Sequence, residues 1–253
     1  MMDTATYLYA ITRPVPPNSL EGLRGVADTP VRSIDDGELA CLVSTVDLAE
    51  FGEDALRANL EDLAWLERTA RQHDAVVQAG TKVTTTLPLR LATICSDDAS
   101  ARERLYRLGR VARDTLATLD GREEWGLKLF APADGARAPE VLATALSGAA
   151  YLRRRRVDIE QRDHAAERAV EDADAVFRRL AAHAVEARRH RPQDQRLTGA
   201  AQPMVLNAAF LVERERVEQF RDAVAELDRE RGDGAVVLTG PWPPYSFVAV
   251  DES

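Results

Sequence analysis

The sequence predicts an α+β protein of two domains with ferredoxin-like character, in which antiparallel sheets are covered by helices, plus a long helical segment. Short runs of β-branched and aromatic residues alternate with amphipathic helical patterns along all 253 residues. A helical pattern ends at Asp120-Gly121, and glycine commonly terminates helices. We therefore place an N-terminal domain at residues 1–121 and a C-terminal domain at 122–253, with the long helix at about 150–190.

The first half predicts the order β-β-β-α-β-α. Its opening run, ATYLYAIT, has the β-branched and aromatic content of a strand, and Asp35-Asp36-Gly37 is a hairpin turn signal. Leucines at steps of three and four residues predict amphipathic helices. The residues expected on the apolar side are Leu56, Leu60, Leu63, Leu66 and Ala70 in the first helix and Leu105, Leu108, Ala112, Thr115 and Leu119 in the second. We expect both helices to cover one face of the sheet. Strands are expected at 5–12, 31–34, 38–46 and 84–94, and helices at 53–79 and 99–119.

The second half predicts β-α-β-α-β, close to a split β-α-β arrangement. The long helix lacks proline, and its apolar stripe consists mostly of small residues, so we expect it to dock weakly on a sheet or partner. A second, shorter helix has a stronger apolar stripe. Strands are expected at 124–130, 203–212, 236–239 and 245–250, and the helices at about 150–190 and 215–231.

The overall composition indicates a folded protein with a highly charged surface. Hydrophobic residues make up 45% of the chain and charged residues 30%, which is typical of globular proteins. The net charge of −9 argues against non-specific nucleic-acid binding. We identify no signal peptide, and no apolar run approaches the roughly 20 residues that a membrane helix needs. We expect a soluble, cytoplasmic protein that is not bound to a membrane.

The residues give no indication of catalysis. Cys41 and Cys95 lie in apolar runs and are expected to be small buried thiols. The four histidines and two cysteines show no metal-ligand spacing, and we find no phosphate-binding loop or nucleophile motif. We therefore expect no enzyme activity, no metal and no cofactor.

The most informative stretch is LTGPWPPYSFV at residues 238–248. Its prolines stiffen the backbone between two expected short strands. Two interpretations of its aromatic residues remain open: they fill a core, or they form an exposed, preformed docking corner, since a rigid surface loses little entropy on binding. The candidate partner contacts are Pro241, Trp242, Pro243, Pro244 and Tyr245.

Six segments together resemble the gas vesicle protein F/L family, in the same order as in that family and across nearly the whole chain. Leu91 and Ala92 depart from the family pattern, which has an aromatic residue and a glycine there. The closing segment is the most specific of the six. They are residues 6–10 (TYLYA), 87–94 (LPLRLATI), 124–128 (EWGLK), 151–152 (YL), 207–212 (NAAFLV) and 238–248 (LTGPWPPYSFV).

The resemblance implies an accessory or minor structural protein of the gas vesicle, and not an enzyme. Such a protein is expected to bind the hydrophobic shell protein, to prevent its aggregation and to support vesicle nucleation and assembly together with other accessory proteins. It also implies two α+β domains of ferredoxin-like character with an added helical portion. We expect the second domain and Trp242 to contribute to shell-protein binding, with the long helix as a second candidate.

Two rival functions are compatible with the fold. A small-molecule-binding regulator or enzyme would need a pocket with convergent polar groups and a titratable residue of shifted pKa. The second rival is a self-assembling scaffold, which would be incorporated in the vesicle wall instead of acting before the wall forms. The sequence does not separate a wall component from a transient helper.

Overall fold

The computed structural model describes residues 3–16, 18–131, 156, 167–194, 202–232 and 235–248. The chain forms two compact units: unit 1 comprises Met1–Glu123 and Trp242–Ser253, and unit 2 comprises Glu124–Pro241. The sequence-based division at residue 121 lies close to the first crossing between units. It assigned the C-terminal segment to the second domain, however, whereas from Trp242 onward the chain belongs to unit 1, where Phe247 is buried.

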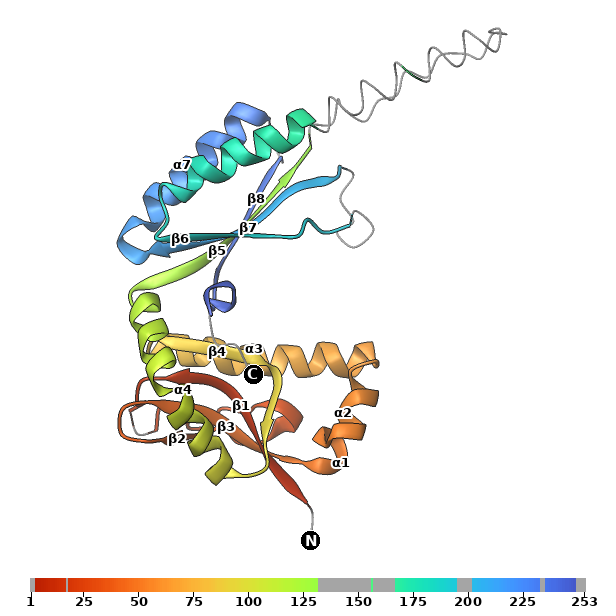
Figure 1. The fold of residues 1–253 in the computed structure, drawn as a ribbon, viewed down its shortest axis with the longest axis vertical. Helices are drawn as coiled ribbons and strands as arrows, with labels where there is room; N and C mark the ends of the chain where they lie inside the picture. Colours follow the sequence, from red (N-terminus) through yellow and green to blue (C-terminus); the bar gives the residue numbers. More distant parts are fainter. Residues whose placement is uncertain are drawn as a thin grey trace, which may run out of the picture. The chain divides into compact units, whose positions relative to one another are not determined.

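Unit 1 contains a four-stranded antiparallel sheet in the order β2-β3-β1-β4 (Figure 1). The hairpin predicted at Asp35-Asp36-Gly37 is confirmed, since β2 and β3 pair on either side of it. The elements of unit 1 are β1 (Thr4–Thr12), η1 (Val26–Asp28), β2 (Arg32–Asp35), β3 (Ala40–Asp47), α1 (Leu48–Phe51), α2 (Glu53–Asn59), α3 (Leu63–Val83), β4 (Thr86–Cys95), α4 (Asp98–Leu119) and η4 (Tyr245–Phe247).

Helices cover both faces of this sheet, so the expectation that they share one face is wrong. On one face, Tyr7 and Tyr9 of β1 pack in a cluster with Val76 of α3. On the other face, Leu8 of β1 and Leu105 of α4 are buried and line the same small void. The central strand β1 is therefore apolar on both sides and buried from its second residue onward.

The single helix predicted over 53–79 is broken into α2 and α3. The Asp62 carboxylate accepts hydrogen bonds from the backbone N–H groups of Ala64 and Trp65, so it caps a new helix at this point. The break rotates the buried face. Trp65 is buried, whereas Leu63, which the periodicity placed on the apolar stripe, is 78% exposed.

Unit 2 contains a second four-stranded sheet, in the order β6-β7-β5-β8. Numbered within each unit, both sheets have the order 2-3-1-4, which is that of the ferredoxin-like fold. Two helices cover one face of the unit 2 sheet, as Figure 1 shows. The elements are β5 (Arg122–Phe130), a helix over 167–181, β6 (Glu186–His190), β7 (Met204–Glu213), η3 (Arg214–Arg216), α7 (Val217–Arg231) and β8 (Val236–Trp242). The predicted fold class is thus confirmed.

Two elements of the second half differ from the predictions. The long helix ends at residue 181 and not near 190, because residues 186–190 pair with β7 as an edge strand. Most of the predicted helix before residue 167 lies outside the described residues. The strand predicted to end at Thr239 continues through Gly240 and Pro241 to Trp242, and the expected strand over 245–250 begins instead as η4.

Candidate partner-binding segment

The C-terminal segment, residues 242–248, follows directly on β8 and packs in unit 1. Gly240 has a φ of +129°, a conformation that favours glycine, and an added Cβ there would lie 3.0 Å from the Glu124 carbonyl oxygen. The peptide bond between Gly240 and Pro241 is cis. Two backbone hydrogen bonds, Tyr245 N–H to the Pro243 oxygen and Phe247 N–H to the Pro244 oxygen, wind the segment into η4.

Burial divides the residues of the signature into two groups: some fill the core of unit 1 and others are exposed to solvent. Phe247, Pro243 and Pro244 are buried and anchor the segment. Trp242 and Tyr245 are 47% and 40% exposed. The fifth candidate contact, Pro241, is also exposed, at the end of unit 2. The structure therefore presents two aromatic side chains on a frame fixed by buried prolines and a buried phenylalanine.

Tyr245 is attached to helix α3 through its hydroxyl group. The hydroxyl donates a long hydrogen bond of 3.5 Å to the Asp74 carboxylate, whose other oxygen accepts from Gln78 at 2.6 Å. Burial of the hydroxyl, and next to it the negative charge of Asp74, raise the pKa of Tyr245 well above its ordinary value. The phenol therefore remains a neutral hydrogen-bond donor, with part of its ring exposed.

A buried polar network lies close to Tyr245 and fixes a bulge in β4. Opposite Tyr9 the pairing of β1 with β4 shifts register, and residues 89–92 form the bulge. The His73 Nε2–H donates to the Leu89 carbonyl oxygen at 3.2 Å, because that oxygen can only accept. His73 Nδ1 then accepts from the Tyr7 hydroxyl at 3.0 Å, and the Tyr7 oxygen accepts from the Ala92 N–H at 3.0 Å.

This network requires a neutral imidazole. Burial lowers the pKa of His73 to about 4, because the charged form loses its hydration. Burial likewise raises the pKa of Tyr7 above its ordinary range. At neutral pH both groups therefore hold the bulge through uncharged hydrogen bonds.

Sequence reasoning identified the aromatic residues of the segment but missed their support. Asp74 and Tyr245 are separated by 171 positions in the chain, and no spacing pattern connects them. The sequence pattern around His73 predicts only that it is not part of a metal site. Val76 and Val77, three and four residues further along α3, are buried. Because residues at these spacings share a helix face, they are the local sign that His73 faces the core.

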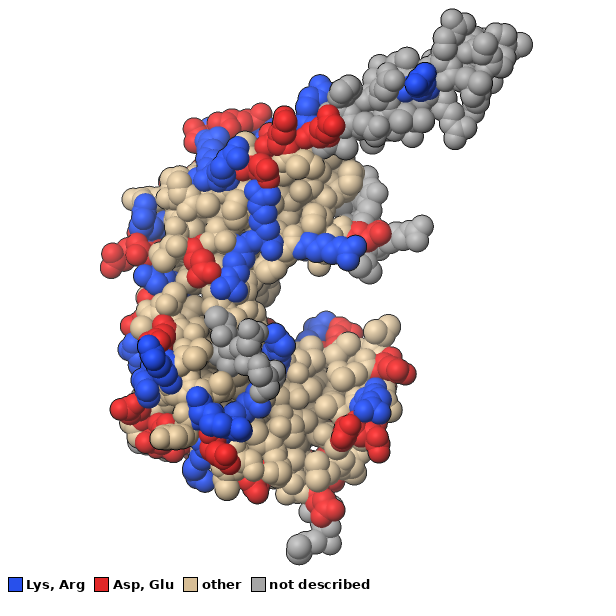
Figure 2. Space-filling view, in the orientation of Figure 1, with Lys and Arg blue, Asp and Glu red and all other residues tan. Residues whose placement is uncertain are grey.

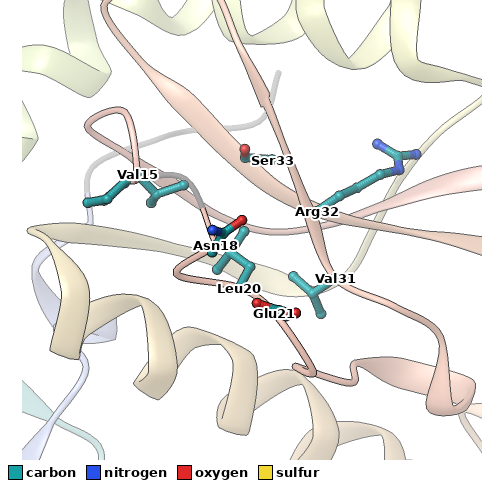
Figure 3. A pocket seen from close by; sticks show the side chains of 8 residues that line it. Val15, Asn18, Leu20, Glu21, Val31, Arg32 and Ser33 are labelled. Carbon is teal, nitrogen blue, oxygen red and sulfur yellow. The ribbon is translucent and has the colours of Figure 1, made fainter.

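A hollow of about 440 Å³ lies elsewhere on unit 1, between the loop after β1 and the edge strand β2 (Figure 3). The Arg32 guanidinium extends away from the hollow and binds Asp98 at 2.8 Å. The polar groups around the hollow therefore do not converge on one point. Among the described residues, no group of three or more His, Cys, Asp or Glu side chains is placed to hold a metal ion, and no helix is long and apolar enough to cross a membrane.

Comparison with known proteins identifies the family. The model of the gas vesicle synthesis proteins GvpL and GvpF matches residues 5–249. The chain belongs to the GvpL/GvpF family. The match to the family model covers the C-terminal segment, residues 242–248. The resemblance found in the sequence is confirmed.

Individual relatives agree with this assignment. The chain is 44% identical to gas vesicle protein L of Streptomyces sp. strain CB03234, with 99% of this chain and 95% of the relative covered. It is 29% identical to gas vesicle protein F of the same organism, over 96% and 99% of the two chains. The crystal structure of GvpF from Anabaena sp. PCC7120 has a TM-score of 0.73 at 19% identity, with 98% of each chain covered, and shows the same fold.

Proposed function

We propose that this GvpL/GvpF protein binds the hydrophobic shell protein of the gas vesicle and keeps it from aggregating while the vesicle nucleates and assembles. In this proposal it acts in the cytoplasm and at the vesicle, together with other accessory proteins, as a binding surface without catalysis. A shell subunit exposes apolar surface until it polymerises, and such surface drives non-specific association. A partner that covers this surface would prevent that association.

The observation that carries the proposal is the exposure of Trp242 and Tyr245 on a buried frame. Tryptophan and tyrosine supply large contact areas with few rotatable bonds, and they are enriched among the residues that dominate binding energies. Because Pro243, Pro244 and Phe247 are buried, the exposed rings are already fixed in position before a partner arrives. Little conformational entropy is then lost on binding.

The proposal is tested by capture of the shell protein on immobilised wild-type protein and on a Trp242→Ala variant. Loss of a central aromatic contact costs about 2 kcal/mol or more, so we expect the affinity to fall by a factor of about 30. Tyr106→Ala is the control, because Tyr106 is another exposed aromatic side chain of unit 1, on α4 and outside the C-terminal segment. If Trp242→Ala folds normally and captures the shell protein as well as Tyr106→Ala does, the segment has only a structural role.

A further inference from the structure

Two surfaces of unit 1 carry exposed apolar side chains with opposite charges around them. The first, here called the acidic corner, comprises residues 53–63, from α2 to the start of α3. Its exposed apolar residues are Leu60 and Leu63, of which Leu63 is 78% exposed. Around them stand four acidic residues and a single arginine: Glu53, Asp54, Glu61, Asp62 and Arg57.

The second surface, here called the basic face, is the solvent side of α4. Tyr106 is 80% exposed and Val111 is also exposed. In a chain of net charge −9, this one helix has five arginines against three acidic residues. Arg102 and Arg110 lie one turn on either side of Tyr106, and Arg107 is its neighbour along the chain. Glu103 also lies one turn before Tyr106, so the charge around the exposed ring is mixed but predominantly positive.

Two of the arginines around Tyr106, Arg107 and Arg110, form no close ion pair with the described residues of the same chain. Arg110 has only a 4.0 Å contact with Asp114, and its side chain is 91% exposed. Arg107 forms no ion pair with any residue that the structure describes. Arg113, by contrast, binds Glu38 at 2.7 Å and is already used. Figure 2 shows mostly acidic side chains over α2, with one basic group among them, and both basic and acidic side chains on the side of unit 1 where α4 lies.

We propose that the protein associates with a second copy of itself head to tail, with the acidic corner of one copy on the basic face of the next. The charges indicate that the partner of each surface is the other surface on a second copy. The corner offers carboxylates around two leucines, and α4 offers guanidinium groups around a tyrosine and a valine. Because the two surfaces differ and lie apart on unit 1, the contact is heterologous and leaves one free surface at each end. Such contacts build rings or open chains.

Sedimentation velocity of the full chain at rising concentration tests the proposal. We expect the mean mass to increase with concentration at about 20 mM salt and to return toward that of the monomer at about 500 mM salt, where charges are screened beyond about 4 Å. Two variants each remove one surface: Arg107→Glu with Arg110→Glu on α4, and Asp54→Lys with Glu61→Lys in the corner. Each should raise the dissociation constant at least tenfold.

The decisive arm is a mixture of the two variants. Each variant alone should be monomeric, because its two surfaces then carry charge of the same sign. The mixture should associate with the two variants in equal amounts, because the intact corner of one meets the intact α4 of the other and the two reversed surfaces are also opposite in charge. Arg216→Glu with Arg229→Glu makes the same charge change on unit 2 and should associate like the wild type. Leu63→Ser and Tyr106→Ser test the apolar part without changing charge and should also weaken association.

The proposal is overturned if the wild type stays monomeric at about 20 mM salt up to the highest concentration that dissolves. It is equally overturned if the α4 variant associates like the unit 2 control, or if the two variants do not associate with each other when mixed. None of these results depends on the shell protein, so the failure of this inference and that of shell-protein binding are distinguishable.

Discussion

At the scale of single residues, unit 1 buries the imidazole of His73, and the hydrogen bonds of this ring require its neutral form. His73 is 3% exposed and bonds at both ring nitrogens, to the Leu89 carbonyl oxygen and the Tyr7 hydroxyl. Protonation would put a charge on a ring whose partners among the described residues include no carboxylate, and it would replace the acceptor at Nδ1 by a donor facing Tyr7.

The free energy of unfolding should therefore depend on His73 in mildly acidic solution. The folded-state pKa is about 4 and the ordinary value is 6.5, so the unfolded chain takes up the proton first. Stability from this group is fully present above pH 6.5 and decreases by up to about 3 kcal/mol as the pH falls towards 4. Urea unfolding of the wild type between pH 7.5 and pH 4.5 measures this loss.

Replacement of the imidazole separates this effect from the titration of other groups. His73→Gln keeps a donor and an acceptor but does not titrate, so the pH dependence of its stability should be flatter across the same range. His190→Gln, at an exposed position, should keep the wild-type slope. A His73→Gln variant that loses stability towards pH 4.5 as steeply as the wild type would contradict the assignment.

At the scale of elements, the bulge in β4 gives a physical reason for the glycine of the family pattern at position 92. Ala92 has a φ of +62°, in the left-handed region where a Cβ is unfavourable and glycine is not. The family resemblance places a glycine at this position, and the hydrogen bond from the Ala92 N–H to Tyr7 holds the backbone there. The chain thus tolerates some backbone strain in order to keep the bulge.

Ala92→Gly should accordingly stabilise unit 1 by up to about 1 kcal/mol, because the relief of the left-handed strain exceeds the entropy that glycine loses on folding. The control is Ala117→Gly on the exposed side of α4, which should destabilise by about 0.5–1 kcal/mol. Thermal unfolding of the two variants checks the opposite signs. Destabilisation by Ala92→Gly would show that the bulge does not strain Ala92.

Element types were predictable from the sequence where the periodicity was strong, as in α4, whose expected inward residues Leu105, Ala112 and Leu119 are buried. Element ends were less predictable. A single aspartate, Asp62, starts a new helix within a continuous leucine pattern. The strand β6 has the sequence EARRH, which favours a helix as readily, and it forms because β7 offers an edge to pair with.

At the scale of the whole molecule, the two-unit α+β architecture and the family followed from the sequence, whereas the path of the last segment did not. Local patterns cannot reveal that Trp242 onward returns to the first unit, since this depends on the contact of Tyr245 with Asp74 and on the burial of Phe247. The exposure of Trp242 was likewise left open by the sequence. In the structure Trp242 is exposed, whereas the two prolines that follow it are buried.

The central claim is that a preformed aromatic surface shields a shell subunit from water. Light scattering of purified shell protein after dilution from denaturant tests it most directly, with this protein present at an equal molar amount. We predict that the wild type suppresses the rise in scattering and that a variant combining Trp242→Ala with Tyr245→Ala suppresses it far less. Shell protein that aggregates equally fast with and without the wild-type protein would contradict the claim.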